Sequence, residues 1–150
     1  MSTNHIVLFI CYGIVQLHTL FYTTIMKPKE KGDIAASYAI HYFMTHGYEV
    51  CLPIGDKRPY DLVVEQNGRL YRVQVKYAGY YIGAGTHKAA LRTMGGNQTY
   101  HTAKKYLDTD FDLLFVYVAN GRTFVIPWAN LPNRNSLAIE ASKFAEYEVK

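Results

Sequence analysis

The spacing of hydrophobic residues predicts one helix followed by a series of strands. Apolar side chains recur at helical spacing across residues 33–46, and this stripe consists of Ala36, Ile40, Phe43 and Met44. Gly47 follows the stripe and favours the end of the helix at that point. The chain therefore predicts a single amphipathic helix ahead of its strand-rich part.

The next segment predicts a short strand, a loop and a hairpin. The strand covers residues 49–53, the loop covers 54–59, and the hairpin strands cover 60–65 and 69–77. Asn67-Gly68 lies between the hairpin strands and favours a two-residue type I′ turn. That turn pairs Gln66 with Arg69 and fixes the register of the whole hairpin.

The second half of the chain predicts more strands. Residues 112–118 form a nearly continuous apolar run, which is typical of a strand buried on both faces. Asn120-Gly121 repeats the hairpin signal, and a return strand is expected over residues 122–127. Helical spacing over 99–107 predicts a second helix, and 128–131 predicts a short turn or helix. The order of elements indicates an α/β fold with a mixed sheet flanked by helices.

The first 25 residues contain no Lys, Arg, Asp or Glu. The stretch is long enough to cross a bilayer, but polar residues interrupt it and it lacks the basic start of a signal peptide. Three interpretations stay open: a membrane segment, a buried arm between subunits, and translation that begins at Met26. We favour Met26 and expect residues 26–150 to form a single domain, with 1–25 outside the working protein and no membrane contact.

Composition and charge narrow the class of protein. A chain of 150 residues suits one globular domain with its own core. The net charge of +4 is compatible with a polyanionic partner. Cys11 and Cys51 lie far apart without metal-binding spacing, so we expect reduced thiols in a cytoplasmic protein.

The register of the first hairpin brings together candidate functional residues. Counting back from the Asn-Gly turn sets Asp61 opposite Gln74, and cross-strand partners point to the same face. Alternation places Lys76 on that face, with Val73 and Val75 on the other. A carboxylate, an amide and an ammonium then converge, and such a group can hold a divalent cation and orient a phosphate.

The stretch from Lys31 to Tyr77 resembles the PD-(D/E)XK nuclease superfamily. The resemblance is carried by Lys31-Gly32, the Leu52-Pro53-Ile54-Gly55-Asp56 loop, Asp61 and the Gln74-Val75-Lys76 tripeptide. It is most similar to the subgroup with Gln in the second acidic position, among homing endonucleases encoded by group I introns of tRNA genes. The resemblance implies a restriction-endonuclease-like core and a Mg²⁺-dependent, site-specific DNA endonuclease.

The resemblance also implies a role for each site residue. Asp61, the Gln74 side chain and the Val75 carbonyl would hold Mg²⁺, and Lys76 would assist an attacking water or stabilise the charged transition state. Many relatives carry an acid in the first helix, and that position falls at Ala36. Asp33 could supply the missing catalytic acid, or it could serve as the N-cap of the helix.

The expected partner is double-stranded DNA, bound by a homodimer or homotetramer because one site cuts one strand. A Gly-rich excursion over residues 78–97 is expected to contact DNA as a loop or a hairpin, although it could instead be a mobile surface excursion. The candidate DNA-binding residues are Lys57, Arg58, Lys88, Arg92, Lys104 and Lys105. Two alternatives stay open: a structure-specific nuclease of the same fold, and a catalytically inactive DNA-binding protein.

Overall fold

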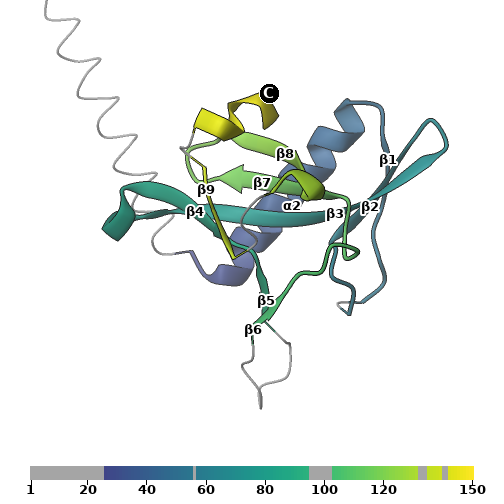
Figure 1. Ribbon diagram of the computed structural model, residues 1–150. Coiled ribbons are helices and arrows are strands. Elements are labelled where there is room, and N and C mark those ends of the chain that lie inside the picture. The colour runs from purple at the N-terminus through teal and green to yellow at the C-terminus, as the bar shows by residue number, and fades with distance from the viewer. Residues whose placement is uncertain (1–25, 56, 95–102, 132–134, 140–141) are drawn as a thin grey trace, which may run out of the picture.

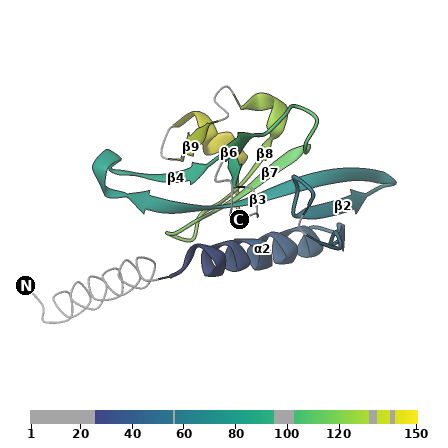
Figure 2. The same ribbon diagram turned by 90° about the horizontal axis from the view of Figure 1, so that it is seen from below.

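A mixed sheet with one helix packed along one of its faces forms the core of the protein (Figures 1 and 2). The structure is a computed structural model, and it describes residues 26–150 apart from 56, 95–102, 132–134 and 140–141. The expectations for residues 1–25 therefore lie outside the described part of the chain. Within the described part, no helix is both long enough and apolar enough to cross a membrane.

The described elements follow one another from the helix to the C-terminal strand. They are α2 (Pro28–Thr45), β1 (Glu49–Cys51), β2 (Leu62–Gln66), β3 (Arg69–Tyr81), η1 (Ile82–Ala84), β4 (Thr86–Ala90), β5 (Arg92–Met94), β6 (Ala103–Lys105), β7 (Leu113–Val118), β8 (Thr123–Pro127), η2 (Trp128–Asn130), β9 (Ser136–Ala138), η3 (Ser142–Tyr147) and β10 (Glu148–Val149).

The helix α2 begins at Pro28, five residues before the predicted start at Asp33. Proline suits the first position of a helix because its fixed φ is already helical and its missing N–H would be unpaired there. The Lys27 backbone N–H donates to Glu30 Oε2 at 3.0 Å, which closes the first turn. The alternative of Asp33 as N-cap is therefore wrong, since Asp33 is an exposed residue inside the helix.

The buried face of α2 also differs from the predicted stripe. Ala35, Ala39 and Phe43 are the buried residues, whereas Met44 is 62% exposed. Small alanines let the helix backbone approach the sheet closely, so tertiary packing decides which side turns inward. This face packs against the side of β3 that carries Val73 and Val75.

The sheet runs in the order β1-β2-β3-β7-β8-β10, with β4 paired to the far half of β3 and β9 paired to β4. The β3–β7 pair is parallel, and its neighbours are antiparallel, so the sheet is mixed as expected. The restriction-endonuclease-like α/β fold predicted from the sequence is confirmed.

The two predicted hairpins are both present. Gln66 pairs with Arg69, and φ angles of 54° at Asn67 and 78° at Gly68 are those of a type I′ turn. The second hairpin joins β7 and β8 through Gly121. The first turn fixes the alignment on which the candidate site depends.

One prediction about the middle of the chain needs correction. A helix is predicted over residues 99–107, of which 99–102 lie outside the described residues, and residues 103–105 form strand β6, which pairs with β5 in a separate two-stranded ribbon. Residues 78–90 of the Gly-rich excursion form a hairpin between the end of β3 and β4, which is one of the two forms expected for this segment. We call the β5–β6 pair the ribbon, and it projects below the sheet in Figure 1.

The second sheet face is covered without an α-helix in the described part of the chain (Figure 2). A cluster of aromatic side chains fills this side, and it includes Tyr106, Phe111 and Trp128. Phe111 and Trp128 lie with ring centroids 4.4 Å apart. Among the described residues, large rings therefore cover this face of the sheet, whereas α2 covers the other.

Candidate functional site

The candidate site lies beside β3, next to the residue that comes directly before the first residue of β2. The Asp61 N–H donates to Val73 O at 2.9 Å, and the chain before Asp61 leaves the sheet. Val75 therefore has no β2 backbone opposite it, and its N–H donates to Asp61 Oδ2 at 2.7 Å. The Asp61 carboxylate thus accepts the hydrogen bond that the backbone of a neighbouring strand would otherwise accept.

Gln74 joins the same cluster from the adjacent position of β3. Its Nε2 donates to Asp61 Oδ2 at 2.5 Å and to the Val75 carbonyl at 3.1 Å. Gln74 is 6% exposed and is the one buried polar residue among those described. Burial of an amide is tolerated when it is hydrogen-bonded, so these contacts explain why a glutamine can lie here.

Lys76 points from the same face of β3 as Gln74. Its Nζ donates to the Arg92 carbonyl at 3.3 Å and lies 5.1 Å from the centre of the Tyr106 ring. The predicted convergence of Asp61, Gln74 and Lys76 at one end of the hairpin is thus present in the structure.

The electrostatic environment perturbs both charged groups of the cluster. Burial raises the pKa of the Asp61 carboxyl, while the Val75 N–H and the Lys76 ammonium lower it in part. Burial lowers the pKa of the Lys76 ammonium, and the Asp61 carboxylate opposes that shift. Opposed shifts on neighbouring groups in a partly buried site are typical of functional centres.

The oxygen donors of the cluster fit a hard divalent cation. Asp61 Oδ1 and Gln74 Oε1 accept no hydrogen bond in the described part of the chain, and a half-turn of the Gln74 amide would bring Oε1 to the place between Asp61 Oδ2 and the Val75 carbonyl that Nε2 now holds. Mg²⁺ prefers such oxygens and retains several waters. One carboxylate supplies the only negative charge, and no group of three His, Cys, Asp or Glu residues occurs among the described residues.

The six candidate DNA-binding residues fall on three elements. Arg92, Lys104 and Lys105 lie exposed on the ribbon. Lys57 and Arg58 lie exposed on the loop before Asp61. Lys88 is separate: it lies on β4, with its Nζ 4.9 Å from the centre of the Tyr81 ring.

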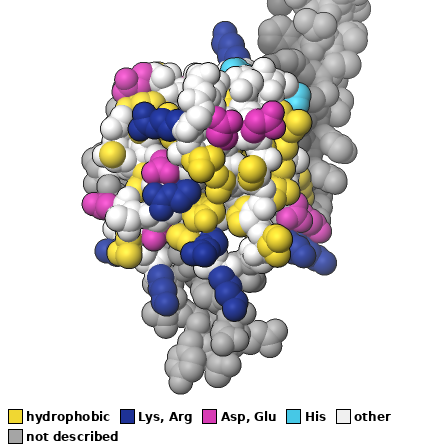
Figure 3. Space-filling model, turned by 90° about the vertical axis from the view of Figure 1, so that its right-hand side faces the viewer, with side chains coloured by type: hydrophobic (Ala, Val, Ile, Leu, Met, Phe, Trp, Pro, Cys, Tyr) yellow, Lys and Arg dark blue, Asp and Glu magenta, His cyan; other side chains and the backbone are white. Residues whose placement is uncertain are grey.

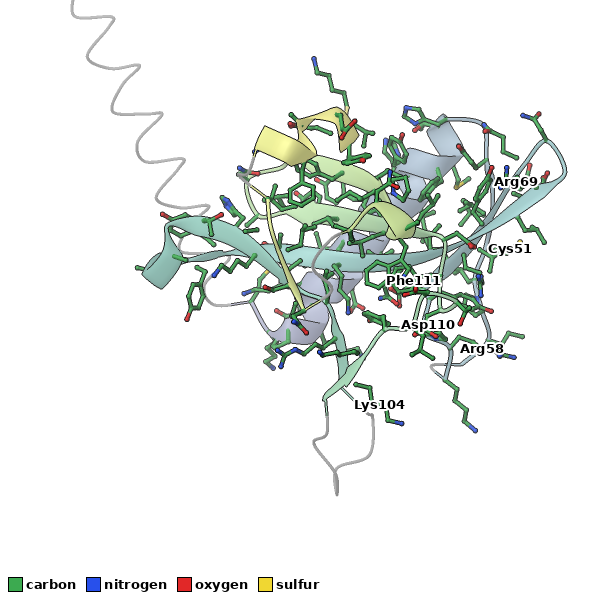
Figure 4. The ribbon with its side chains drawn as sticks, in the orientation of Figure 1. Cys51, Arg58, Arg69, Lys104, Asp110 and Phe111 are labelled. Atoms are coloured by element: carbon green, nitrogen blue, oxygen red, sulfur yellow. The ribbon has the colours of Figure 1, made fainter. Side chains whose placement is uncertain are left out.

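The figures show on which side of the molecule these basic side chains lie. Figure 4 places Arg58 and Lys104 on the same lower side of the molecule. Lys and Arg side chains also stand at the lower edge of the face in Figure 3, at the height of the ribbon. The loop and the ribbon therefore present positive charge on one side of the protein.

The structure does not join Asp33 to the cluster. Asp33 is exposed on α2, and its carboxylate makes no hydrogen bond or ion pair with a described residue. Ala36 is half-buried on the same helix. Because α2 packs on the Val73 and Val75 face, it lies on the opposite side of β3 from Lys76.

Sequence reasoning missed the groups that surround Lys76. Tyr106 lies in the segment for which a helix is predicted, and its pKa is raised by burial and by the nearby carboxylates of Asp61 and Asp110. The Arg92 carbonyl is a backbone group, so residue identity carries no signal for it. Both lie more than a dozen residues from Lys76, and only the tertiary fold brings them to it.

Comparison with known proteins identifies the class to which this site belongs. A family model described as PD-(D/E)XK endonuclease matches residues 26–145, and the chain belongs to this family. Among solved structures it is similar to "The structure of a bacterial homing endonuclease: I-Ssp6803I". The match has 26% identity and a TM-score of 0.71, and it covers 82% of this chain and 89% of that chain. A search of curated proteins finds no match.

The family resemblance predicted from the hairpin and its flanking loop is therefore confirmed. The assignment to a subgroup defined by Gln at position 74 stays a prediction. The individual roles of the site residues are likewise predictions, and the geometry above is the basis for testing them.

Proposed function

We propose that this chain is a Mg²⁺-dependent, site-specific DNA endonuclease that acts as a homo-oligomer in intron homing. The observation that carries the proposal is the cluster in which Asp61 Oδ2 accepts from Gln74 and Val75 beside Lys76. Membership of the endonuclease family supports the reaction class. The homing role rests on the similarity to the bacterial homing endonuclease.

Three oxygen donors would hold the metal: the Asp61 carboxylate, the Gln74 amide oxygen and the Val75 carbonyl. When bound there, Mg²⁺ supplies positive charge against the phosphate and the leaving oxygen. Asp61 provides the charge that attracts the cation, and the β3 backbone sets its position. Because only one carboxylate contributes, we expect the bound phosphate to provide much of the remaining affinity.

Lys76 would act on the phosphate itself. Water attacks phosphorus, the bond to the 3′ oxygen breaks, and that oxygen leaves with a proton as a 3′-hydroxyl beside a 5′-phosphate. The Lys76 ammonium would stabilise the extra negative charge of the transition state by hydrogen bonding to a non-bridging oxygen. Its partial burial strengthens that interaction, since competing water is reduced.

The loop and the ribbon would bind the DNA backbone around the scissile phosphate. Lys57 and Arg58 lie three to four residues before Asp61 in the chain. The backbone carbonyl of Arg92 accepts the hydrogen bond from Lys76, so the Arg92 side chain starts close to the site. Cationic side chains flanking the site neutralise phosphates and set the register of the duplex. We include Lys88 as a peripheral contact on the β3–β4 hairpin.

Mg²⁺-dependent cleavage of supercoiled plasmids carrying intronless tRNA-gene inserts tests the proposal. We expect discrete cutting by the wild type, and a loss of at least about 100-fold with Lys76→Ala, as for removal of a transition-state donor. Lys29→Ala is the matched control, because Lys29 is an exposed lysine on α2 away from the cluster. Unchanged cutting by Lys76→Ala would reject Lys76 as the catalytic lysine.

The same assay separates the two alternative functions. Preference for branched DNA over every linear insert would indicate a structure-specific nuclease. Tight, salt-sensitive DNA binding without cleavage at any Mg²⁺ concentration would indicate an inactive DNA-binding protein.

Two variants test the proposed acid on α2. If Asp33 supplies it, Asp33→Asn lowers the cleavage rate and Ala36→Glu does not raise it. If position 36 is where relatives carry the acid, Ala36→Glu raises the rate and Asp33→Asn is neutral. Thermal melting of both variants checks that each still folds.

A further inference from the structure

We propose that Tyr106 is a positioning residue for Lys76, and that its ring and the Arg92 carbonyl together hold the ammonium at the site. The inference rests on the proposed catalytic role of Lys76. It adds a residue that lies outside the Asp61 and Gln74-Val75-Lys76 motif and that sequence reasoning assigned to a helix.

The contacts of Lys76 show why it needs such support. Its Nζ makes one hydrogen bond in the described part of the chain, a long one of 3.3 Å to the Arg92 carbonyl. The ring centre of Tyr106 lies 5.1 Å from the same atom. A lysine has a flexible four-carbon stem, so one long hydrogen bond does not define where its charge lies. The ring provides the second restraint.

An aromatic face has a chemical advantage over a carboxylate in this position. It attracts a cation through its negative face without using N–H donors. The ammonium carries three donors, of which Arg92 accepts one, so two stay available for phosphate oxygens. A carboxylate partner would instead occupy these donors and repel the phosphate.

Tyr106 is itself firmly held. Its ring meets Phe111 edge-on at 5.0 Å and 83°, and Trp128 at 6.0 Å and 90°. The Trp128 indole N–H donates to the Leu107 carbonyl at 3.0 Å, which fixes the residue after Tyr106. Tyr106 is only 6% exposed. A ring packed this tightly is a rigid surface against which a flexible lysine can rest.

Both groups that hold Lys76 lie at the base of the ribbon. Arg92 is the first residue of β5, and Tyr106 directly follows β6. The Arg92 and Lys105 positions are paired across the ribbon, so two cations lie opposite each other. Like charges in this arrangement repel unless an anion lies near them. The segment proposed to bind phosphate thus also positions the lysine proposed to act on it.

Solution NMR tests the contact without reference to activity. A methylene that lies over an aromatic ring shifts upfield, so we expect the Lys76 ε-CH₂ signal to be upfield of the other lysines. Comparison with Lys76→Ala assigns the signal. Tyr106→Phe keeps the ring and should keep the shift, whereas Tyr106→Met replaces the ring with a flexible apolar side chain and should remove it.

Single-turnover cleavage then tests the role. We expect Tyr106→Phe to cut near the wild-type rate, and Tyr106→Met to lose about 10- to 100-fold in rate, the cost of a misplaced catalytic group, with unchanged DNA affinity. Tyr71→Met is the matched control, because its ring lies under Arg69 at the same 5.1 Å but at the far end of the hairpin. It should leave the rate unchanged.

The outcomes separate this inference from the proposed function. An absent upfield shift in the wild type, or full activity of Tyr106→Met without the shift, overturns the positioning role. If Lys76→Ala cleaves normally, the catalytic role of Lys76 fails even where the NMR contact is present. The Lys76 ε-CH₂ shift is measured in the wild type and needs no variant at position 106. It therefore tests the inference even if Tyr106→Met misfolds.

Discussion

Gln74 is the residue at which this site departs from the acid that the superfamily motif carries. Its amide donates to Asp61 Oδ2, so in this arrangement it relieves the negative charge of the single carboxylate. A carboxylate at position 74 would offer a second charged ligand but would lose that hydrogen bond. In the proposed metal site, this residue would therefore balance stability of the hairpin against affinity for a cation.

The first prediction concerns this balance. Gln74→Glu should lower the stability of the protein without Mg²⁺ by about 1–3 kcal/mol, because a buried donor is removed and two carboxylates meet. Added Mg²⁺ should then raise the melting temperature of the variant by more than that of the wild type. Thermal melting with and without Mg²⁺ measures both effects.

Gln66→Glu is a suitable control for that prediction. Gln66 also donates through Nε2, to the His46 carbonyl at 3.2 Å, but it lies at the turn end of β2. Its replacement should cost stability without adding a response to Mg²⁺. An equal Mg²⁺ response in the wild type and Gln74→Glu would show that position 74 does not face the metal.

At the scale of elements, the β2–β3 turn sets the alignment of Asp61 with Gln74. Gly68 has a φ of 78°, and a Cβ added there would meet nothing within 4 Å. The second prediction is that Gly68→Ala destabilises the protein by about 1–2 kcal/mol, through backbone strain alone. Chemical denaturation with a linear extrapolation measures this difference.

For Gly32→Ala we expect the opposite change in stability. Gly32 lies inside α2, and a Cβ there also meets nothing within 4 Å. Alanine in a helix interior should stabilise by up to about 1 kcal/mol relative to glycine. Equal changes in stability for Gly68→Ala and Gly32→Ala would show that local backbone conformation does not determine these changes.

The ribbon is one of the elements proposed to bind the DNA backbone. The third prediction is that Lys104→Gln with Lys105→Gln weakens binding and lowers the salt slope by roughly 0.9 for each phosphate that the protein no longer neutralises. Lys29→Gln with Lys150→Gln removes the same charge from exposed positions outside the proposed interface. Fluorescence anisotropy over a range of salt concentrations compares the two pairs, and identical slopes would exclude the ribbon from the interface.

At the scale of the whole molecule, each chain contributes one cluster of Asp61, Gln74 and Lys76. In the proposed mechanism a single cluster would hydrolyse one strand, so a double-strand break would need two chains with the target between them. The fourth prediction is that mixed oligomers of wild type and Lys76→Ala produce nicked circles instead of linear plasmid. Gel separation of the three plasmid forms after co-refolding measures this outcome, and the absence of a nicked product would argue against one cluster per strand.

Local interactions explain what the sequence could predict. The Asn67-Gly68 turn needs two residues with positive φ, and strand alternation then follows with period two, so the meeting of Asp61 and Gln74 is determined by residues within about fifteen positions. The apolar run of β7 and the presence of a second hairpin were also predictable, but Val118 pairs with Arg122 there, so the connection has three residues, of which only Gly121 has a positive φ.

Long-range packing decided the rest. The phase and start of α2 depended on which side fits the sheet and on the Lys27 to Glu30 contact. The periodic stripe placed the start wrongly and the phase correctly only in part, since Phe43 and Ile40 face the core but Met44 does not. Residues 103–105 pair with β5, because strand pairing outweighs a weak helical spacing. The sequence by itself determined the cluster of Asp61, Gln74 and Lys76. Only the tertiary structure placed Tyr106 and the Arg92 carbonyl beside Lys76, because those contacts join segments that no local rule connects.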